Sequence, residues 1–244
     1  MKRIAFALVC LLAQPAWALD LGGEWVVSDW PAGQSSIMGW SPANVRPGTD
    51  GIDLVLGSNP ASEVGAETRP FLGGEVQSKG AAETGVWSWR VRAPKMVEGA
   101  VFGMFLYRAD HEDDPWREYD IEFVGEGTTE VELNIHFEDA SGRHVSLLGG
   151  PKKVELGFDA AEDFHDYEIE VKAERAIFRI DGKVVGDFGP ADVEGSVWST
   201  GPLRSFVDLW AVQPAQAGWA GVWNWNGTPL TATLAGVSLP PAAR

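Results

Sequence analysis

The sequence predicts an all-β protein, either a sandwich or a barrel of short strands. Short runs in which apolar and polar residues alternate recur along the chain, and Gly, Pro and Asp separate them. Long amphipathic helical patterns are hard to find. The 29 glycines and 15 prolines fit the many turns that such a fold requires.

The clearest predicted strands, in chain order, are Trp87–Ala93, Val131–Phe137, Tyr167–Val171 and Ala176–Ile180. The last of these runs into Asp181-Gly182, and a second apolar run follows at once. Asp-Gly between two apolar runs is a strong signal for a two-residue β-hairpin. The one helical piece that the pattern allows is short and lies around Asp159–Phe164.

The first residues have the layout of a secretory signal peptide. Lys2-Arg3 is basic, Ile4–Ala13 is apolar, and residues 16–18 have the small-x-small pattern of a cleavage site. The apolar run is too short for a bilayer core of ~30 Å, which needs ~20 residues, and this argues against a retained anchor. Cys10 lies inside the run rather than after it, which argues against a lipoprotein. We therefore expect residues 1–18 to be removed and the protein to be secreted or periplasmic.

Residues 19–244 are predicted to form a single domain, because no repeat or Pro/Ser-rich linker divides them. Cys10 is the only cysteine, so the mature chain has no disulfide, thiol nucleophile or thiolate metal site. The four histidines do not show metal-ligand spacing, and no metal or cofactor is expected.

Charge and aromatic content bear on the ligand. The formal net charge is −16, whereas nucleic acid and anionic membranes require clusters of Lys and Arg. We expect neither as a partner, and a monomer that acts on a neutral substrate fits this composition. The 12 tryptophans include possible stacking surfaces for sugar rings, although any single one also fits a core position.

The segment Trp116–Phe123 carries three carboxylates at alternate positions. On a strand, alternate side chains share a face. The face that belongs in the core holds Tyr119, Ile121 and Phe123, and the opposite face holds Glu118, Asp120 and Glu122. The Cα atoms of the two glutamates are about 13 Å apart at ~3.3 Å per residue. Their long side chains can converge to the ~5–5.5 Å carboxyl separation of retaining glycosidases.

A solvent-facing polar strand is the alternative interpretation of this segment. Three like charges in a row repel one another unless their pKa values separate or protons are shared. Carboxylates held in this way are what general acid and base chemistry needs. The pattern by itself leaves both interpretations open.

This segment closely resembles the catalytic strand of glycoside hydrolase family 16, in the lichenase branch, whose pattern is Glu-x-Asp-x-Glu. The resemblance covers roughly Met38 to Leu239. The other segments that carry it are Gly74–Ser78, Gly85–Lys95, Phe105–Tyr107, Asp114–Trp116, Gly125–Asn134, Leu156–Ala160, Phe164–Tyr167, Asp181–Lys183 and Leu209-Trp210.

The resemblance implies a fold and a mechanism. The fold is a jelly-roll β-sandwich, in which two curved antiparallel sheets leave a substrate cleft on the concave face. Glu118 is then the nucleophile, Glu122 is the acid/base, and Asp120 hydrogen-bonds the nucleophile and tunes its proton affinity. The implied substrate-binding residues are Glu75, Phe105, Tyr107, Trp116, Asn134, His136 and Trp210. Of these, Phe105 also fits a core position.

Several residues depart from the lichenase pattern near the expected cleft. Arg117 and Tyr119 replace an Asp and an Ile, Gln77 replaces an Arg, and His136 replaces an aromatic Tyr. We expect Arg117 to add positive charge beside the carboxylates. These departures leave the three carboxylates intact, so they bear on the substrate rather than on the chemistry.

Other departures concern stability. Met38 and Gly73 occupy the positions of a disulfide found in some members of the family. Ala235 replaces an Asp that helps to hold a structural calcium ion, which puts a calcium site in doubt.

The resemblance implies a secreted, retaining endo-β-1,3-1,4-glucanase. Laminarinase-type members carry an extra residue before the last Glu of the motif, a bulge that this sequence lacks. Two other enzyme functions remain open: depolymerisation of an acidic, succinoglycan-like bacterial exopolysaccharide, and transglycosylation. The non-enzyme alternative is a lectin-like carbohydrate-binding module on the same sandwich.

Overall fold

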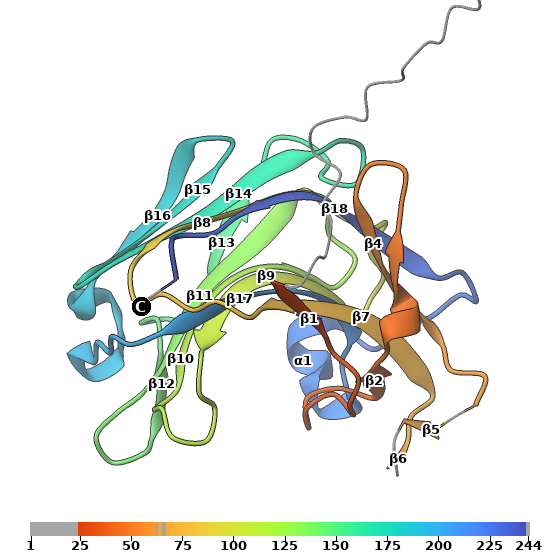
Figure 1. Cartoon of the computed structure of the whole chain (residues 1–244), viewed down its shortest axis with the longest axis horizontal. Helices are drawn as coiled ribbons and strands as arrows, with labels where there is room; N and C mark the ends of the chain where they lie inside the picture. The colour runs from red at the N-terminus through yellow and green to blue at the C-terminus, as the bar shows by residue number, and fades with distance from the viewer. Residues whose placement is uncertain (1–23, 62, 65–66, 243–244) are drawn as a thin grey trace, which may run out of the picture.

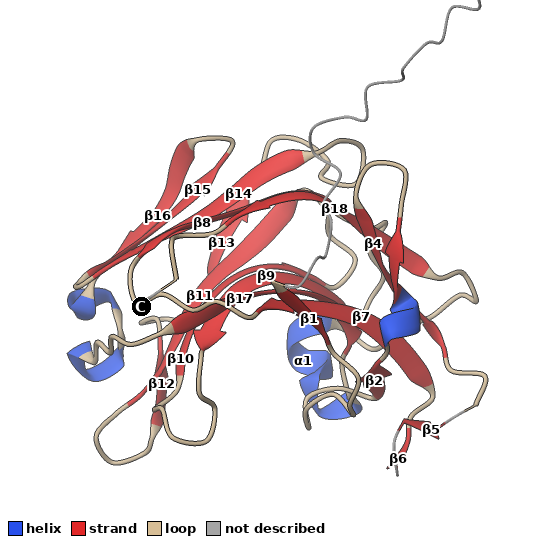
Figure 2. Cartoon of the chain, in the orientation of Figure 1, coloured by secondary structure: helices blue, strands red, loops and turns tan. Residues whose placement is uncertain are grey.

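The computed structural model describes residues 24–242 except residues 62, 65 and 66. The proposed signal peptide, residues 1–18, lies outside the described residues. The chain forms two curved layers of antiparallel strands with the core between them (Figures 1 and 2). The predicted all-β jelly-roll architecture is confirmed.

The first layer carries the central strands of the molecule. Its path is β12 (His144–Ser146), β11 (Glu130–Glu138), β10 (Arg117–Val124), β9 (Ala100–Arg108), β17 (Leu203–Ala211) and β7 (Phe71–Ser78). Three short strands extend it, namely β13 (Lys152–Glu155) on β11, and β1 (Trp25–Val27) and β2 (Met38–Trp40) on β7. Among the strands that the structure describes, only the pairing of β2 with β7 is parallel.

The second layer covers the convex face of the first. Its path is β4 (Ile52–Ser58), β18 (Leu230–Ser238), β8 (Gly85–Arg92), β14 (His165–Lys172), β15 (Arg175–Ile180) and β16 (Lys183–Phe188), with β3 (Val45–Pro47) beside β4. Gly57 and Ser58 of β4 pair with Leu72 and Phe71 of β7, so the two layers form one hydrogen-bonded path. A separate small hairpin joins β5 (Glu63–Val64) to β6 (Glu67–Thr68).

The helical pieces among the described residues are all short. They are η1 (Pro42–Asn44), η2 (Pro190–Asp192), η3 (Glu194–Ser196), η4 (Pro214–Gln216) and α1 (Ala217–Ala220). In Figure 1, α1 and β2 lie below the first layer, on the face turned away from the second layer. They border the concave face, so residues of both reach the cleft.

The prediction of a helix around Asp159–Phe164 is wrong. This segment is a turn, because the Asp159 carboxylate accepts hydrogen bonds from the Thr128 hydroxyl at 2.6 Å and from the Ala161 amide at 3.0 Å. An aspartate that captures an amide of its own turn competes with helical hydrogen bonding. The short helix α1, which the sequence did not reveal, forms instead at residues 217–220.

The predicted hairpin at Asp181-Gly182 is confirmed. Ile180 pairs with Lys183 across a two-residue loop, and both loop residues have positive φ, at 48° and 74°. Such a turn matches the right-handed twist of the strands that it connects.

The core lies between the two layers and is rich in aromatic side chains. Trp87 and Trp89 of β8 face inward from the second layer, and Tyr119 and Phe123 of β10 face them from the first. The buried indole of Trp89 donates to the Ser205 hydroxyl at 2.9 Å. With no cysteine after residue 10, apolar burial at about 25 cal/mol per Å² is the main source of stability.

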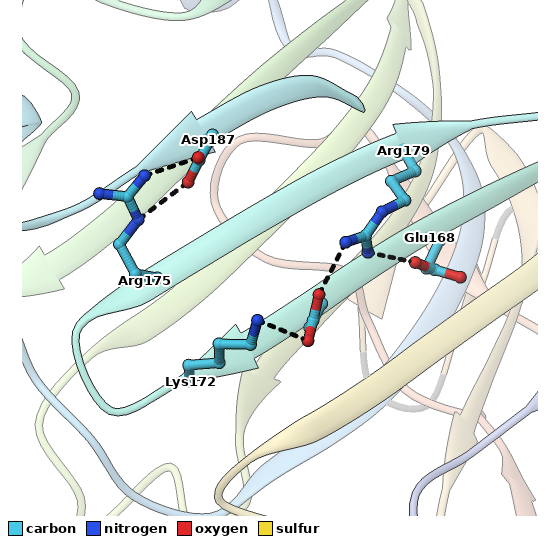
Figure 3. Close-up of polar contacts among 6 residues, drawn as sticks. Glu168, Lys172, Arg175, Arg179 and Asp187 are labelled. Atoms are coloured by element: carbon cyan, nitrogen blue, oxygen red, sulfur yellow. Dashed lines mark hydrogen bonds and ion pairs between the residues drawn. The ribbon is translucent and has the colours of Figure 1, made fainter. Parts of the chain in front are cut away.

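The outer face of the second layer carries a network of ion pairs (Figure 3). Arg179 contacts Glu168 at 2.5 Å and Glu170 at 2.8 Å, and Arg175 contacts Asp187 at 2.6 Å. The network ties β14, β15 and β16 together across the solvent face and places charge along the sheet edge at β16. Charged edges hinder pairing with a second chain.

Candidate active site

Strand β10 lies between β9 and β11 in the middle of the first layer, and its alternation separates two environments. Tyr119, Ile121 and Phe123 are buried in the core. Glu118, Asp120 and Glu122 project to the opposite, concave face, and all three line one cavity there. The structure therefore places the three carboxylates together, as the alternation predicts.

Antiparallel register extends this face into three transverse rows. Residues directly opposite one another in antiparallel strands share a face. The first row is His136, Glu118, Tyr107 and Arg204, the second is Asn134, Asp120, Phe105, Phe206 and Gln77, and the third is Glu132, Glu122, Gly103, Asp208 and Glu75. All seven substrate-binding candidates except Trp116 and Trp210 belong to these rows.

Three adjoining hollows lie along the described part of the cleft. The central one, of about 180 Å³, is lined by all three motif carboxylates together with Asp208 and Trp210. A hollow of about 510 Å³ lies on one side and one of about 370 Å³ on the other. Glu118 lines all three, so the motif stands where the hollows meet. Volumes of this order suit a sugar chain rather than a single small ion.

Burial makes the motif carboxylates weak acids. It raises the pKa of Glu118 to about 7. The pKa of Glu122 rises to about 8, mainly through burial and further through the charges of Glu118 and Glu132. Burial, then the charges of Glu118 and Glu122, raise the pKa of Asp120 well above its ordinary value. The cleft therefore retains protons near neutral pH, which a general acid requires.

Trp116 holds the first motif glutamate. Its indole N–H donates to Oε2 of Glu118 at 2.6 Å. This bond and the positive charge of Arg108 both favour the ionised form of Glu118 and partly offset the effect of burial on its pKa. An oriented, partly ionised carboxylate suits a nucleophile.

The expectation for Arg117 is wrong. Its side chain is 2% exposed, lies on the core side of β10 and pairs with Asp114 at 2.9 Å. A strand residue one position before Glu118 must point to the other face. The cation whose charge reaches Glu118 is Arg108, at the end of β9.

A pair of histidines lies beside Asp120. Nδ1 of His136 is 2.7 Å from Nε2 of His144, and the Asn134 amide is 3.1 Å from Nε2 of His136. If the Asn134 amide donates, the proton of His136 is on Nδ1 and points to His144. Burial, then the charge of His144, lower the pKa of His136 to about 4, so this ring is neutral at pH 7. Nε2 of His136 is 3.4 Å from Oδ2 of Asp120.

The other predicted cleft residues also border the hollows. Phe105 lies on the cleft side rather than in the core and stacks on Phe206, with ring centroids 5.0 Å apart. The Ser28 hydroxyl donates to the buried Glu75 carboxyl, whose pKa burial raises to about 7. Trp210 lines two of the hollows.

Several cleft residues escaped the sequence prediction, among them Asp208, Glu132 and Trp219. Asp208 is 6% exposed, and burial followed by the charge of Glu75 raises its pKa well above the ordinary value. The Trp219 indole, on α1, donates to Oε2 of Glu132 at 2.8 Å, and its ring is 6.1 Å from that of Trp210. Asp208 and Glu132 lie two residues before Trp210 and Asn134 on their strands, so strand alternation could have predicted both on the cleft face. No sequence pattern indicates Trp219.

The structure shows what occupies the positions where the family has a disulfide or a calcium ligand. The Met38 side chain covers Gly73, where an added Cβ would lie 2.6 Å from the methionine methyl carbon. Apolar packing therefore occupies the place of the implied disulfide. Ala235 is buried beside a register shift in β18 and offers no side-chain ligand, which does not fit a calcium site. Among the described residues, no group of three His, Cys, Asp or Glu side chains could hold a metal ion.

The described residues include no helix that is long and apolar enough to cross a membrane.

The described residues form a curved all-β sandwich with a carboxylate-lined cleft on its concave face. The model of the family described as glycosyl hydrolases family 16 matches residues 35–227, and the chain belongs to this family.

Relatives and solved structures agree with the family assignment. A β-glucanase of Acetivibrio thermocellus is 32% identical over 162 residues, 66% of this chain but 45% of the relative's length. A β-glucanase of Brevibacillus brevis is 28% identical over 82% of this chain and 70% of its own length. The structure of the Bacillus licheniformis β-glucanase superimposes with a TM-score of 0.74 at 26% identity, covering 91% of this chain and 94% of that one.

Proposed function

We propose that this protein is a retaining endo-β-glucanase that hydrolyses mixed-linkage β-1,3-1,4-glucan by double displacement. The observation that carries the proposal is the row of Glu118, Asp120 and Glu122 at the meeting point of three hollows. The similarity to β-glucanases supports the substrate class. The unbulged spacing of the motif favours mixed-linkage glucan over pure β-1,3-glucan.

The roles follow from the environments of the two glutamates. Glu118, which accepts from Trp116 and has the lower pKa of the two, attacks the anomeric carbon and forms a glycosyl-enzyme. Glu122, with a pKa of about 8, protonates the leaving oxygen and then takes a proton from the incoming water. Asp120 lies between them, and its retained proton can be donated to the nucleophile.

The cleft walls supply the sugar contacts in this proposal. Trp210, Trp116 and Phe105 offer aromatic faces for stacking, and Tyr107 borders the larger hollow. Glu75, Asn134 and His136 offer hydrogen-bonding groups to sugar hydroxyls.

A panel of lichenan, barley glucan, laminarin, carboxymethylcellulose and succinoglycan, with sizing of the products, tests the substrate. We expect the fastest release of reducing ends from lichenan or barley glucan. Equal or faster release from laminarin would contradict the mixed-linkage assignment. Glucan binding without turnover would instead favour a lectin-like module, and longer products would favour transglycosylation.

We also propose that the protein is exported as a monomer. The layout of residues 1–18 supports export, and the mature domain then begins at residue 19. Intact-mass measurement on protein from the periplasm or the medium tests cleavage, and a mass that includes residues 1–18 contradicts it. Light scattering on the same sample reports the oligomeric state.

A further inference from the structure

The largest hollow of the cleft contains an uncommon feature for so acidic a protein. Its volume is about 510 Å³, and two arginines, Arg108 at the end of β9 and Arg204 on β17, stand in its wall. Register places Arg204 opposite Tyr107, in the same transverse row as Glu118. We call this hollow the arginine pocket and define it by Arg108, Arg204, Tyr107 and Phe206.

Neither arginine forms an ion pair within 4.0 Å among the described residues. Five other arginines do form ion pairs within 4.0 Å, and these are Arg90, Arg117, Arg143, Arg175 and Arg179. Arg108 donates from Nη1 to the Asp114 carbonyl at 2.5 Å. The Nε atoms of Arg108 and Arg204 are buried and have no hydrogen-bond partner in the described chain. Two guanidinium groups without an ion-pair partner thus lie in one hollow of a chain that has 35 acidic residues.

The carboxyl groups nearby do not satisfy these arginines. Glu75 and Glu118 also line the pocket, but burial raises the pKa of each to about 7, so both are largely neutral at pH 6. Asp110 feels the charge of Arg204, yet its Oδ1 accepts the amides of Glu112 and Asp113 at 3.0 Å each. The pocket therefore holds two guanidinium groups that have no ion-pair partner in contact, although their charges reach Glu118 and Asp110.

Aromatic rings complete the pocket. Phe206 contacts Tyr107 edge-to-face at 6.1 Å, and the Arg108 guanidinium lies 5.4 Å from the centre of the Tyr107 ring. A sugar ring presents apolar faces to aromatic rings, and guanidinium groups match the geometry of a carboxylate. Together they suit a sugar that carries an acidic group.

We propose that the arginine pocket binds a carboxylate carried by the glucan chain, on a sugar residue close to the one that is cleaved. The proposal rests on the proposed function and specifies its substrate class as an acidic β-glucan. The net charge of −16 repels such a chain at long range, but screening at physiological salt has a length of ~8 Å, so the local arginines decide the contact.

Matched polymers made from one parent test this. Barley mixed-linkage glucan is used unmodified, with part of its 6-hydroxymethyl groups oxidised to carboxylates, or with part of its hydroxyls esterified with succinate. Initial rates at pH 6 give kcat/KM for each polymer. Affinity electrophoresis in gels that contain each polymer reports binding without turnover.

We expect kcat/KM for at least one acidic polymer to exceed that for the neutral polymer, and salt to reduce the difference. R204Q should lower the acidic-to-neutral ratio about tenfold, as one charged hydrogen bond at ~1.4 kcal/mol per decade predicts. R204K should keep part of the preference. R90Q makes the same change of charge on the exposed outer face, where Arg90 pairs with Asp166, and should leave the ratio unchanged.

The outcomes separate the two proposals. Preference for the oxidised polymer alone identifies a uronic acid in the backbone, and preference for the succinylated polymer alone identifies an acidic substituent. Equal use of all three polymers, with a ratio that R204Q does not change, would overturn the arginine pocket while leaving the glucanase function intact. If no polymer is cleaved, the glucanase function fails, and the gels still decide whether the pocket prefers acidic chains.

Discussion

Each motif glutamate has a nearby side chain that changes its pKa. Trp116 and Arg108 favour the ionised form of Glu118, whereas Glu132, directly opposite Glu122 on β11, favours the protonated form of Glu122. The pKa values of about 7 and about 8 therefore fall in the order that a nucleophile and an acid require.

Azide rescue tests this division. E118A should abolish turnover, and azide should restore it by attack from the vacated face, giving a glycosyl azide of inverted configuration. E122A should retain the first step on an activated aryl glycoside, and azide should give a product of retained configuration. Natural polysaccharide should lose about 10²–10⁴-fold in rate with E122A. Exchange of the two configurations between the variants would reverse the roles.

The pH profile tests the influence of Glu132. We expect kcat/KM to rise through about pH 7 as Glu118 ionises and to fall through about pH 8 as Glu122 loses its proton. E132Q removes a negative charge that raises the pKa of Glu122, so the alkaline limb should move to lower pH. E138Q, further along β11, is the matched control. An alkaline limb that E132Q leaves in place would show that Glu132 does not act on Glu122.

Gly103 of β9 shows how a strand provides space for a side chain of the cleft. It lies between Glu122 of β10 and Asp208 of β17, and an added Cβ would be 2.8 Å from Oδ1 of Asp208. The missing side chain thus leaves room for the Asp208 carboxyl in the floor of the cleft. Strand order brings these residues together although they are far apart in sequence.

Substitution of this glycine is therefore expected to be costly. G103A should displace the Asp208 carboxyl and lower the free energy of unfolding by about 1–3 kcal/mol through overpacking, with a loss of activity. G127A is the control, because nothing lies within 4 Å of the Cβ added there. Urea unfolding and kcat/KM measure both effects. Equal stability of the two variants would contradict the close approach of Gly103 and Asp208.

For the whole molecule, ionisation of the buried cleft carboxyl groups is expected to lower the free energy of unfolding at high pH. Burial raises the pKa values of Glu75, Glu118, Asp120, Glu122 and Asp208. From about pH 4 to about pH 8 the native state therefore binds more protons than the unfolded chain, and the free energy of unfolding falls as pH rises. Surface carboxylates with lowered pKa values, such as Asp139, have the opposite effect mainly below about pH 5. His136, whose pKa is lowered from 6.5 to about 4, also has the opposite effect, but the five cleft carboxylates outweigh this single group.

Urea unfolding should therefore have a higher midpoint at pH 5 than at pH 8.5. The double variant E118Q/E122Q, which removes two of the titrating groups, should reduce this difference. A midpoint that is equal or higher at pH 8.5 would show that the cleft carboxylates titrate near their ordinary values. The m-value, measured at both pH values, checks that the unfolding transition is the same.

The sequence by itself determined the strand-rich fold, the Asp181-Gly182 hairpin and the face that Glu118, Asp120 and Glu122 share, because strand periodicity and turn chemistry are local. It wrongly predicted a helix at Asp159–Phe164, because the Asp159 side chain accepts the Ala161 amide in a turn there.

Only the tertiary structure decided which distant side chains complete the cleft. Register between β10, β9 and β17 brought Gly103 and Asp208 beside Glu122, and α1 brought Trp219 to Glu132. Arg204 was likewise placed in the arginine pocket by the pairing of β17 with β9. Pairing between strands far apart in sequence is set by the packing of the whole sandwich, and burial between its layers then fixes the pKa values that the chemistry uses.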